Sequence, residues 1–410
     1  MEKKNNINKK MTIGIVDADL LDNGTRHPNL VLMKIAGYCR DHSISYKFIF
    51  DENENLRKYS FIYVSKVFTF SKEPVFLGKK NKNKIKKGGT GYYAEEENLE
   101  KFILLQNEDM KSLEIDPNFP GFSMARQMPD YTLYDLYIKN EIESKGKDSK
   151  QFKDYQHYSI GFLTRGCIRK CPFCVNKNID FVYDYSSLSD FVDPTRPKIY
   201  LWDDNFLASK NWKSLLLELQ ATNRPFQFRQ GLDVRLLNEE KAQLLSKSKY
   251  HGDFIFAFDQ LKDKELISRK LTLWKRHSKK TTKLYLFCGY EVSDDNSLIS
   301  DILDLFERIE VLMKFGCLGY VMRHKNYKNH SLNNIYVQIA RWCNQPQFYK
   351  KMSLKEFIDR NQFWTKTDIK CTSLKTYEAF MEKYADHHIK LNYYFNMRYE
   401  TVINPNLWEQ

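Results

Sequence analysis

The sequence contains no run of about 18 uncharged apolar residues, which is the minimum for a helix that crosses a membrane. The N-terminal stretch MEKKNNINKK lacks the apolar core of a signal peptide, and we expect residues 1–10 to form a disordered basic tail. No internal repeat stands out, and the one low-complexity tract is a lysine-rich segment at 79–87. These absences lead us to expect no membrane partner and a cytoplasmic location.

Cysteine is also scarce, with eight residues among 410. Thiols stay reduced in the cytoplasm, so cysteines that lie close together there indicate metal binding or catalysis rather than disulfide bonds. Three of the eight fall within one short stretch, GFLTRGCIRKCPFCVN at 161–176. This crowding of a rare residue is the most specific feature of the chain.

Basic residues outnumber acidic residues, 65 to 52, which gives a formal net charge of +13. Such an excess favours an anionic partner such as a nucleic acid. A sequence rich in Lys, Asn and Ile is also typical of AT-rich genomes, and in that case the lysines only solvate the surface. Both interpretations stay open for the basic loop, which consists of Lys79, Lys80, Lys82, Lys84, Lys86 and Lys87.

The first part of the chain predicts a small α/β domain. Three apolar runs predict strands, namely MTIGIVDADL, SYKFIF and FIYVSKVFTF, and Pro28 predicts the start of a helix after the first of them. This order is typical of a doubly wound, Rossmann-like domain, which we assign to residues 11–120. Residues 121–155 predict a connector whose first half packs and whose second half is mobile.

From residue 156 onward, strands and helices alternate six times. The predicted strands are YSIGFLTRGC, PKIYLWDDNF, FQFRQGLDV, DFIFAFD, KLYLFCGYE and CLGYVMRH. Six such units in one series fit a partial (β/α)6, TIM-like barrel over 156–330 better than an open sheet. Residues 331–410 show helical patterns without a strand series, and we predict a helical C-terminal cap.

The three crowded cysteines have the spacing Cys-x3-Cys-x2-Cys, at Cys167, Cys171 and Cys174. Thiolates bind zinc or iron–sulfur clusters, and a structural zinc site usually has four ligands. The next cysteine, Cys288, is more than a hundred residues away. Three thiolates on a four-iron cluster leave one iron open for another ligand. The loop also follows the first barrel strand, and parallel barrels carry their chemistry at the carboxyl ends of the strands.

This cysteine spacing, with Phe173 before the last cysteine, resembles the signature of radical S-adenosylmethionine (radical SAM) enzymes. The resemblance implies that Cys167, Cys171 and Cys174 hold a 4Fe–4S cluster, whose open iron binds S-adenosylmethionine (SAM). It also implies reductive cleavage of SAM to a 5′-deoxyadenosyl radical that abstracts hydrogen from a substrate. An external electron donor, such as a flavodoxin or a ferredoxin, would supply the electron.

The same resemblance predicts SAM-binding residues at the ends of the later strands. The stretch WDDNF replaces the usual Gly-Gly-Glu and offers acceptors for the SAM ammonium group. An arginine in FRQGLDVR could clamp the SAM carboxylate, or it could pair with an aspartate of a neighbouring strand. The full predicted set is Asp203, Asp204, Asn205, Arg229, Gln230, Asp233, Arg235, Asp259 (for the ribose) and Gly289 (near the adenine).

The N-terminal domain resembles the cobalamin-binding-like Rossmann domain that precedes many radical SAM barrels. Its cobalamin signature, Asp-x-His-x-x-Gly, is missing from the first strand–helix turn, and we expect His27 to be a capping or packing residue. Cobalamin is therefore not expected. Cys288 and Cys317 lie on predicted strands and are expected to be small buried apolar residues rather than radical relays or methyl acceptors.

The sequence thus predicts a radical SAM enzyme whose substrate it does not identify, with modification of a nucleic acid or nucleotide as one option. The alternative is a nucleic-acid-binding protein with a purely structural iron–sulfur or zinc site. The sequence predicts neither the oligomeric state nor whether SAM also donates a methyl group.

Overall fold

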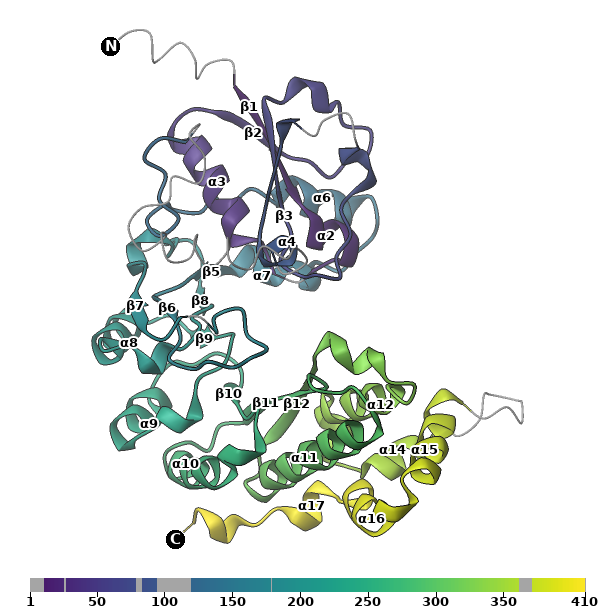
Figure 1. Cartoon of the computed structure of the whole chain (residues 1–410). Coiled ribbons are helices and arrows are strands. Elements are labelled where there is room, and N and C mark those ends of the chain that lie inside the picture. Colours follow the sequence, from purple (N-terminus) through teal and green to yellow (C-terminus); the bar gives the residue numbers. More distant parts are fainter. Residues whose placement is uncertain are drawn as a thin grey trace. The chain divides into compact units, whose positions relative to one another are not determined.

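The computed structural model describes residues 11–25, 27–78, 83–93, 119–177, 179–360 and 371–409 (Figure 1). The chain forms two compact units, which divide between Asp203 and Asp204. The predicted tail at 1–10 lies outside the described residues, as does part of the predicted N-terminal domain. Each unit is a mixture of helices and parallel strands, so the α/β class predicted from the sequence is confirmed.

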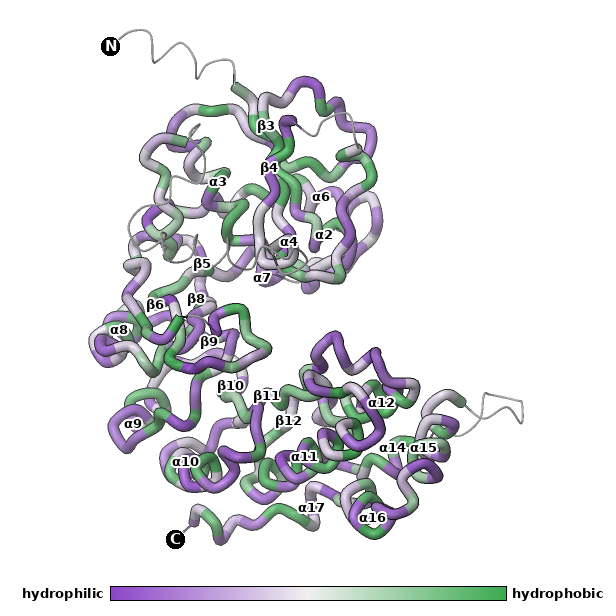
Figure 2. The backbone as a smooth tube through the Cα atoms, in the orientation of Figure 1, coloured by the Kyte–Doolittle hydropathy of each residue, from purple (hydrophilic) through white to green (hydrophobic). Residues whose placement is uncertain are grey.

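The first unit, Met1–Asp203, begins with a four-stranded parallel sheet in the order β2-β1-β3-β4. Ile13 of β1 lies opposite Tyr46 of β2 and Phe61 of β3. The outer strand β4 carries two lysines and is hydrophilic in Figure 2. The strand order is that of doubly wound folds, in which β1 and β3 flank the point where the chain reverses direction. The strands are β1 (Thr12–Asp17), β2 (Ser45–Phe48), β3 (Phe61–Ser65) and β4 (Ile85–Gly88).

The helix predicted to start at Pro28 begins two residues later. Asn29 is its N-cap, because its Oδ1 accepts a hydrogen bond from Leu32 N at 3.2 Å. A short helix directly after β1 was not predicted, and Asp17 caps it by accepting from Leu20 N at 3.0 Å. The helices are α2 (Ala18–Asn23), α3 (Leu30–Asp41) and α4 (Thr90–Tyr93).

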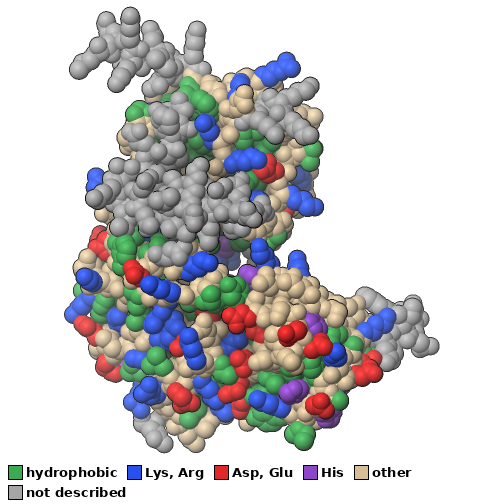
Figure 3. Space-filling model, in the orientation of Figure 1, with side chains coloured by type: hydrophobic (Ala, Val, Ile, Leu, Met, Phe, Trp, Pro, Cys, Tyr) green, Lys and Arg blue, Asp and Glu red, His purple; other side chains and the backbone are tan. Residues whose placement is uncertain are grey.

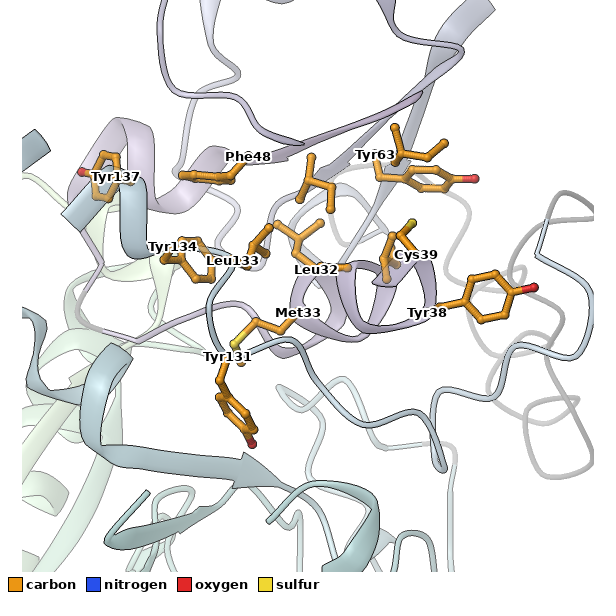
Figure 4. Packing of buried hydrophobic residues seen from close by; sticks show 14 of the residues in the cluster. Leu32, Met33, Tyr38, Cys39, Phe48, Tyr63, Tyr131, Leu133, Tyr134 and Tyr137 are labelled. Atoms are coloured by element: carbon orange, nitrogen blue, oxygen red, sulfur yellow. The ribbon is translucent and has the colours of Figure 1, made fainter. Parts of the chain in front are cut away.

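The core of this unit packs α3 against the sheet and against the predicted connector (Figure 4). Leu32 and Met33 of α3 share one cluster with Tyr63 of β3 and Tyr134. Phe152 and Tyr155 are also buried in this cluster, so the end of the connector packs, whereas mobility of its second half stays a prediction. The connector contains α6 (Asp135–Glu143), a 3-10 helix (Ser149–Phe152) and α7 (Lys153–His157).

Two buried side chains join the connector to the parallel strand pair β5 (Tyr158–Gly161) and β8 (Lys198–Leu201). The hydroxyl of Tyr131 accepts from Ile160 N at 2.8 Å and donates to Phe191 O at 2.6 Å. The guanidinium of Arg196 lies over the Tyr131 ring and donates to the Tyr131 carbonyl oxygen at 2.9 Å. The first barrel strands and the N-terminal sheet therefore belong to one compact unit.

The second unit, Asp204–Gln410, contains the later strand–helix series. Its main sheet is parallel in the order β10-β11-β12, and isolated bridges join Phe226 to Tyr250 and Leu232 to Phe256. Along α11, green and purple segments alternate in Figure 2, as expected for a helix with one buried face. The elements are α8 (Trp212–Ala221), β9 (Phe226–Phe228), α9 (Glu239–Ser246), β10 (Phe254–Ala257), α10 (Lys264–His277), β11 (Thr282–Cys288), α11 (Asp295–Lys314) and β12 (Leu318–Arg323).

All six predicted barrel strands are present, although closure into a partial barrel stays a prediction. The residues described between 331 and 409 form helices, as predicted for the C-terminal region: α12 (Asn334–Cys343), α13 (Pro346–Tyr349), α14 (Leu354–Asp359), α15 (Thr372–Lys383), α16 (His388–Asn396) and α17 (Tyr399–Val402). Among the described helices, none is both long enough and apolar enough to cross a membrane.

Candidate functional site

The three crowded cysteines lie on the loop of an antiparallel hairpin in the first unit. The strand predicted before them is divided into β5 and a second strand, β6 (Thr164–Gly166), which pairs with β7 (Val182–Asp184). The loop between β6 and β7 begins with Cys167, directly after Gly166. The hairpin therefore fixes both ends of the cysteine loop.

Gly166 allows the chain to turn from β6 into the loop. Its φ is +89°, a left-handed conformation that favours glycine, and a Cβ there would lie 2.3 Å from Phe181 O. A larger residue would both strain the backbone and push apart the two ends of the loop. The requirement for glycine directly before the first cysteine is thus steric.

Backbone amides point at two of the three sulfur atoms. Arg169 N donates to Cys167 Sγ at 3.3 Å, and Asn176 N donates to Cys174 Sγ at 3.5 Å. Cys174 N also donates to Cys171 O at 3.0 Å, which closes a turn between the second and third cysteines. Amide–sulfur hydrogen bonds of this kind stabilise thiolates and tune the potential of iron–sulfur clusters.

The cysteine loop differs from the other cysteine positions in exposure. Cys167, Cys171 and Cys174 are half-buried, whereas the other five cysteines are buried. Cationic side chains lie in and beside the loop, with Arg165 over the Phe162 ring at 4.3 Å and Lys170 3.5 Å from Asp180.

A metal ion alone has no preformed site here: among the described residues, no group of three or more His, Cys, Asp or Glu side chains could hold one. The loop nevertheless fits a 4Fe–4S cluster by its donor chemistry, with three accessible sulfur ligands and amides aimed at two of them. The three predicted ligands stay the candidates for such a cluster.

Asp203 supports the hairpin from the end of β8. Its Oδ1 accepts from Thr164 N at 2.6 Å and from Thr164 Oγ1 at 2.7 Å, while its Oδ2 accepts from Leu163 N at 3.2 Å. The carboxylate is buried. Asp203 was predicted to bind SAM, and these contacts add a structural role that the sequence did not indicate.

Asp204 and Asn205, the next two predicted residues, begin the second unit. Asp204 is half-buried, and Asn205 is buried immediately before a 3-10 helix, Phe206–Ala208. Their assignment to the SAM ammonium group stays a prediction.

The polar stretch after β9 forms an ion-pair network. Arg235 Nε lies 2.7 Å from Asp233 Oδ1, and Arg235 Nη1 lies 2.6 Å from Asp263 Oδ2. For Arg235 the structure thus has the aspartate pairing that was one of the two predicted options. Arg229 donates to Gln227 Oε1 at 3.0 Å, and Gln230 is exposed.

Asp259 follows β10 and has an unusual protonation equilibrium. Burial raises its pKa to about 6, although the cations Arg308 and Arg235 act in the opposite direction. Gly289 follows β11 with φ +75°, and its amide donates to Asp301 Oδ2 at 2.9 Å. A Cβ at Gly289 would lie 2.7 Å from Tyr327 Cβ, so the segment after β12 packs closely on this turn.

Two residues of α11 organise these strand ends and were not predicted. Arg308 is buried and donates from Nη1 to three carbonyl oxygens, those of Phe258, Asp259 and Phe287, at 2.9–3.1 Å. Asp301 accepts from the Gly289 amide and from the hydroxyl of Tyr336. The only signal in the sequence was a charged residue at a helix position that the 3.6-residue period assigns to the buried face.

Cys288 and Cys317 are buried, as expected for small apolar residues. Burial raises the pKa of both thiols, that of Cys317 to about 11. Neither thiol is therefore poised as a nucleophile.

The three described lysines of the basic loop contact other residues of the first unit. Lys84 Nζ donates to Tyr59 O at 2.9 Å, and Lys87 Nζ donates to Glu73 Oε1 at 2.5 Å. Lys86 Nζ lies 5.7 Å from the centre of the Phe61 ring. Lys79, Lys80 and Lys82 lie outside the described residues.

Solved structures that resemble the chain are those of a radical SAM methyltransferase, which belongs to the superfamily named above from the cysteine spacing. That protein is TsrM from Kitasatospora setae. One structure, with cobalamin and a 4Fe–4S cluster bound, has a TM-score of 0.45 and 11% identity over 77% of this chain and 75% of its own. Another, with tryptophan and a SAM analogue, has a TM-score of 0.44 and 10% identity over 76% and 72%. No protein-family model and no curated protein matches the sequence.

The expectation that cobalamin is not a cofactor is contradicted by this comparison, since one of the similar structures was determined with cobalamin bound. The missing Asp-x-His-x-x-Gly signature was the basis of that expectation. A histidine signature marks one way of holding the cofactor, so its absence does not exclude the others.

Proposed function

We propose that the chain is a radical SAM enzyme in which Cys167, Cys171 and Cys174 ligate a 4Fe–4S cluster. The observation that carries this proposal is the cysteine loop itself: three accessible thiols on one hairpin loop, with backbone amides directed at two of the sulfurs. When bound, such a cluster supplies the electron for reductive cleavage of SAM to methionine and a 5′-deoxyadenosyl radical.

The residues around the loop have supporting roles in this proposal. Asp203 holds Leu163 and Thr164, and so fixes the strand that leads into Cys167. Gly166 provides the turn into the loop, and Arg165, directly before it, lies over the Phe162 ring. In the second unit, Asp204, Asn205, Arg229, Gln230, Asp233, Arg235, Asp259 and Gly289 remain the predicted contacts of SAM.

Anaerobic reconstitution tests the ligand assignment. The parent chain should bind about four irons with thiolate-to-iron charge-transfer absorption, and replacing all three loop cysteines with Ala should abolish both. Cys317→Ala is the control, because it removes a cysteine outside the loop and should keep the iron. A triple variant that retains the full cluster would refute the assignment.

Turnover of SAM separates this function from a purely structural cluster in a nucleic-acid-binding protein. With a chemical reductant, or with a reduced flavodoxin or ferredoxin as the proposed electron donor, the reconstituted chain should convert SAM to 5′-deoxyadenosine even without substrate. An intact, reducible cluster that yields no 5′-deoxyadenosine would favour the structural alternative.

A further inference from the structure

A pocket in the first unit lies apart from the cysteine loop in sequence and has no role in the proposed reaction. It has a volume of about 520 Å³. One side is formed by the end of α2 and the turn after it, with Gly24 and Thr25, and the other by Tyr137 of α6 and the segment 147–154. The aromatic rings of Tyr137 and Phe152, both largely buried, form the apolar part of its lining.

Lysines give the pocket a positive charge. Lys147, Lys150 and Lys153 all line it. Lys147 Nζ is paired with Glu141 Oε2 at 2.5 Å, whereas Lys150 and Lys153 are exposed and form no ion pair within the described part of the chain. Two ammonium groups are therefore available to an anion, and each has three hydrogen-bond donors.

Asp154 gives the same pocket a buried acceptor. Its side chain is 8% exposed, and its Oδ2 lies 2.8 Å from His27 Nδ1. Its Oδ1 is buried, takes part in no ion pair with a described residue, and accepts no hydrogen bond from one. Buried polar atoms are nearly always hydrogen-bonded, so this oxygen points to a donor supplied from outside the chain.

We propose that this pocket binds a small phosphorylated ligand that carries a sugar hydroxyl, that is, a ribose phosphate or a nucleotide. Lys150 and Lys153 match the phosphate. Asp154 lines the pocket with its Oδ1 buried, so its side chain would turn into the pocket to accept from a ribose hydroxyl, as aspartate does in many nucleotide sites. An anion without a hydroxyl offers no hydrogen bond to Asp154, and the negative oxygens of the anion lie near the Asp154 carboxylate. A neutral sugar leaves the two ammonium groups unused.

Calorimetry on the cluster-reconstituted chain tests the proposal, with ribose 5-phosphate, AMP, ribose and inorganic phosphate as probes. Saturating SAM is present throughout, so that AMP is not measured at a SAM site. Ribose 5-phosphate should bind saturably and more tightly than either ribose or phosphate. If AMP binds more tightly than ribose 5-phosphate, the ligand is a nucleotide. If the two bind equally tightly, the ligand is a sugar phosphate.

Two variants and a matched control assign the binding to the pocket. Lys150→Gln with Lys153→Gln should weaken ribose 5-phosphate at least tenfold, because two charge-assisted contacts are lost. Lys72→Gln with Lys86→Gln removes the same charge from exposed lysines that do not line the pocket, and should change the affinity less than twofold. Asp154→Asn should weaken ribose 5-phosphate but not inorganic phosphate, because the substitution also removes a carboxylate that repels the free anion.

The absence of saturable binding by every probe would overturn the proposal. An equal loss in the control pair would also overturn it, because the effect would then be one of net charge. Both results are read as ligand affinity, whereas the proposed function is read as iron content and 5′-deoxyadenosine formation, so failure of the pocket and failure of the proposed function are measured separately.

Discussion

Asp203 supports the hairpin that carries the cysteine loop. Its carboxylate accepts three hydrogen bonds from two consecutive residues, Leu163 and Thr164, in a buried environment. A buried charged acceptor with three donors stabilises the fold more than a neutral acceptor would. Its loss leaves backbone amides without a hydrogen-bond partner.

We therefore predict that Asp203→Asn destabilises the protein even without cluster or SAM. The amide has one acceptor oxygen and no charge, so the expected loss is about 1–3 kcal/mol of unfolding free energy. Thermal and urea unfolding of the apoprotein measure it. Asp180→Asn, on the same hairpin but exposed, is the control and should be nearly neutral. If Asp203→Asn unfolds like the parent, its role is confined to ligand binding.

At this scale the sequence predicted what depends on local spacing. Cys167, Cys171 and Cys174 were found because their chemistry is encoded within eight positions. Arg308 and Asp301 were missed because their partners come from the segment after β10, from β11 and from α12, which only the folded chain brings to α11. Asp203 was found for its place after a strand, but the donors it holds lie 39 and 40 residues earlier.

At the scale of elements, the junction of β1 and α2 has a titratable group at its centre. Asp17 ends β1, caps α2 and accepts a hydrogen bond from the hydroxyl of Tyr134 at 2.9 Å. Burial raises the pKa of Asp17 from 3.8 to about 7, and the hydrogen bonds from Leu20 and Tyr134 only partly oppose this. The folded chain therefore keeps a proton on Asp17 that the unfolded chain has already lost.

This difference predicts a fall in stability as the pH rises. Between the unfolded pKa of 3.8 and the folded pKa of about 7, the folded state binds more protons, so raising the pH favours unfolding. The slope from this one group is at most about 1.4 kcal/mol per pH unit. Asp17→Asn should remove that slope, because an amide does not titrate in this pH range. Its oxygen can still accept from Leu20, so the cap of α2 is kept.

Urea unfolding at pH 5, 6, 7 and 8 measures the effect in the parent and in Asp17→Asn. Asp51→Asn, at an exposed aspartate, serves as the control and should keep the slope of the parent. An Asp17→Asn profile parallel to that of the parent would show that another group governs the pH dependence.

The prediction of elements succeeded where hydrophobic periodicity was strong and failed at their ends. Most strands of both units were recognised, but β4, which lies partly in the lysine-rich segment, and β7 were not. Helix α3 starts at Leu30 rather than Pro28 because Asn29 provides the cap. The strand before the cysteines was predicted as one element. It is two, because Asp203 and the β7 pairing redirect the chain after Gly161.

At the scale of the whole molecule, the net charge of +13 raises the question of a nucleic-acid partner. On the face of the second unit drawn in Figure 3, basic and acidic side chains are interspersed. The basic loop remains the candidate, and its two halves differ. Lys84 and Lys87 have partners within the chain, whereas Lys79, Lys80 and Lys82 lie outside the described residues.

We predict weak RNA binding that falls steeply with salt and depends on the first half of the loop. Replacing Lys79, Lys80 and Lys82 with Gln should reduce the slope of log affinity against log salt by about 2, since each phosphate contact contributes roughly 0.7–0.9. Replacing Lys84, Lys86 and Lys87 with Gln changes the charge equally but should reduce the slope less. Filter binding at several salt concentrations measures both. Unchanged slopes in both variants would mean that the loop is only solvated surface.

The hydrogen bond from Arg196 to the Tyr131 carbonyl spans 65 residues, and this separation has a consequence during synthesis. At about 5–20 residues per second, a ribosome needs roughly 3–13 seconds to advance from Tyr131 to Arg196. During that interval the emerging connector can pack on the N-terminal sheet, through contacts such as Tyr134 with Asp17, but it lacks the strands that complete its other side. The nascent chain therefore exposes this side of the connector until β5 and β8 have emerged, and the cysteine loop is translated within that interval.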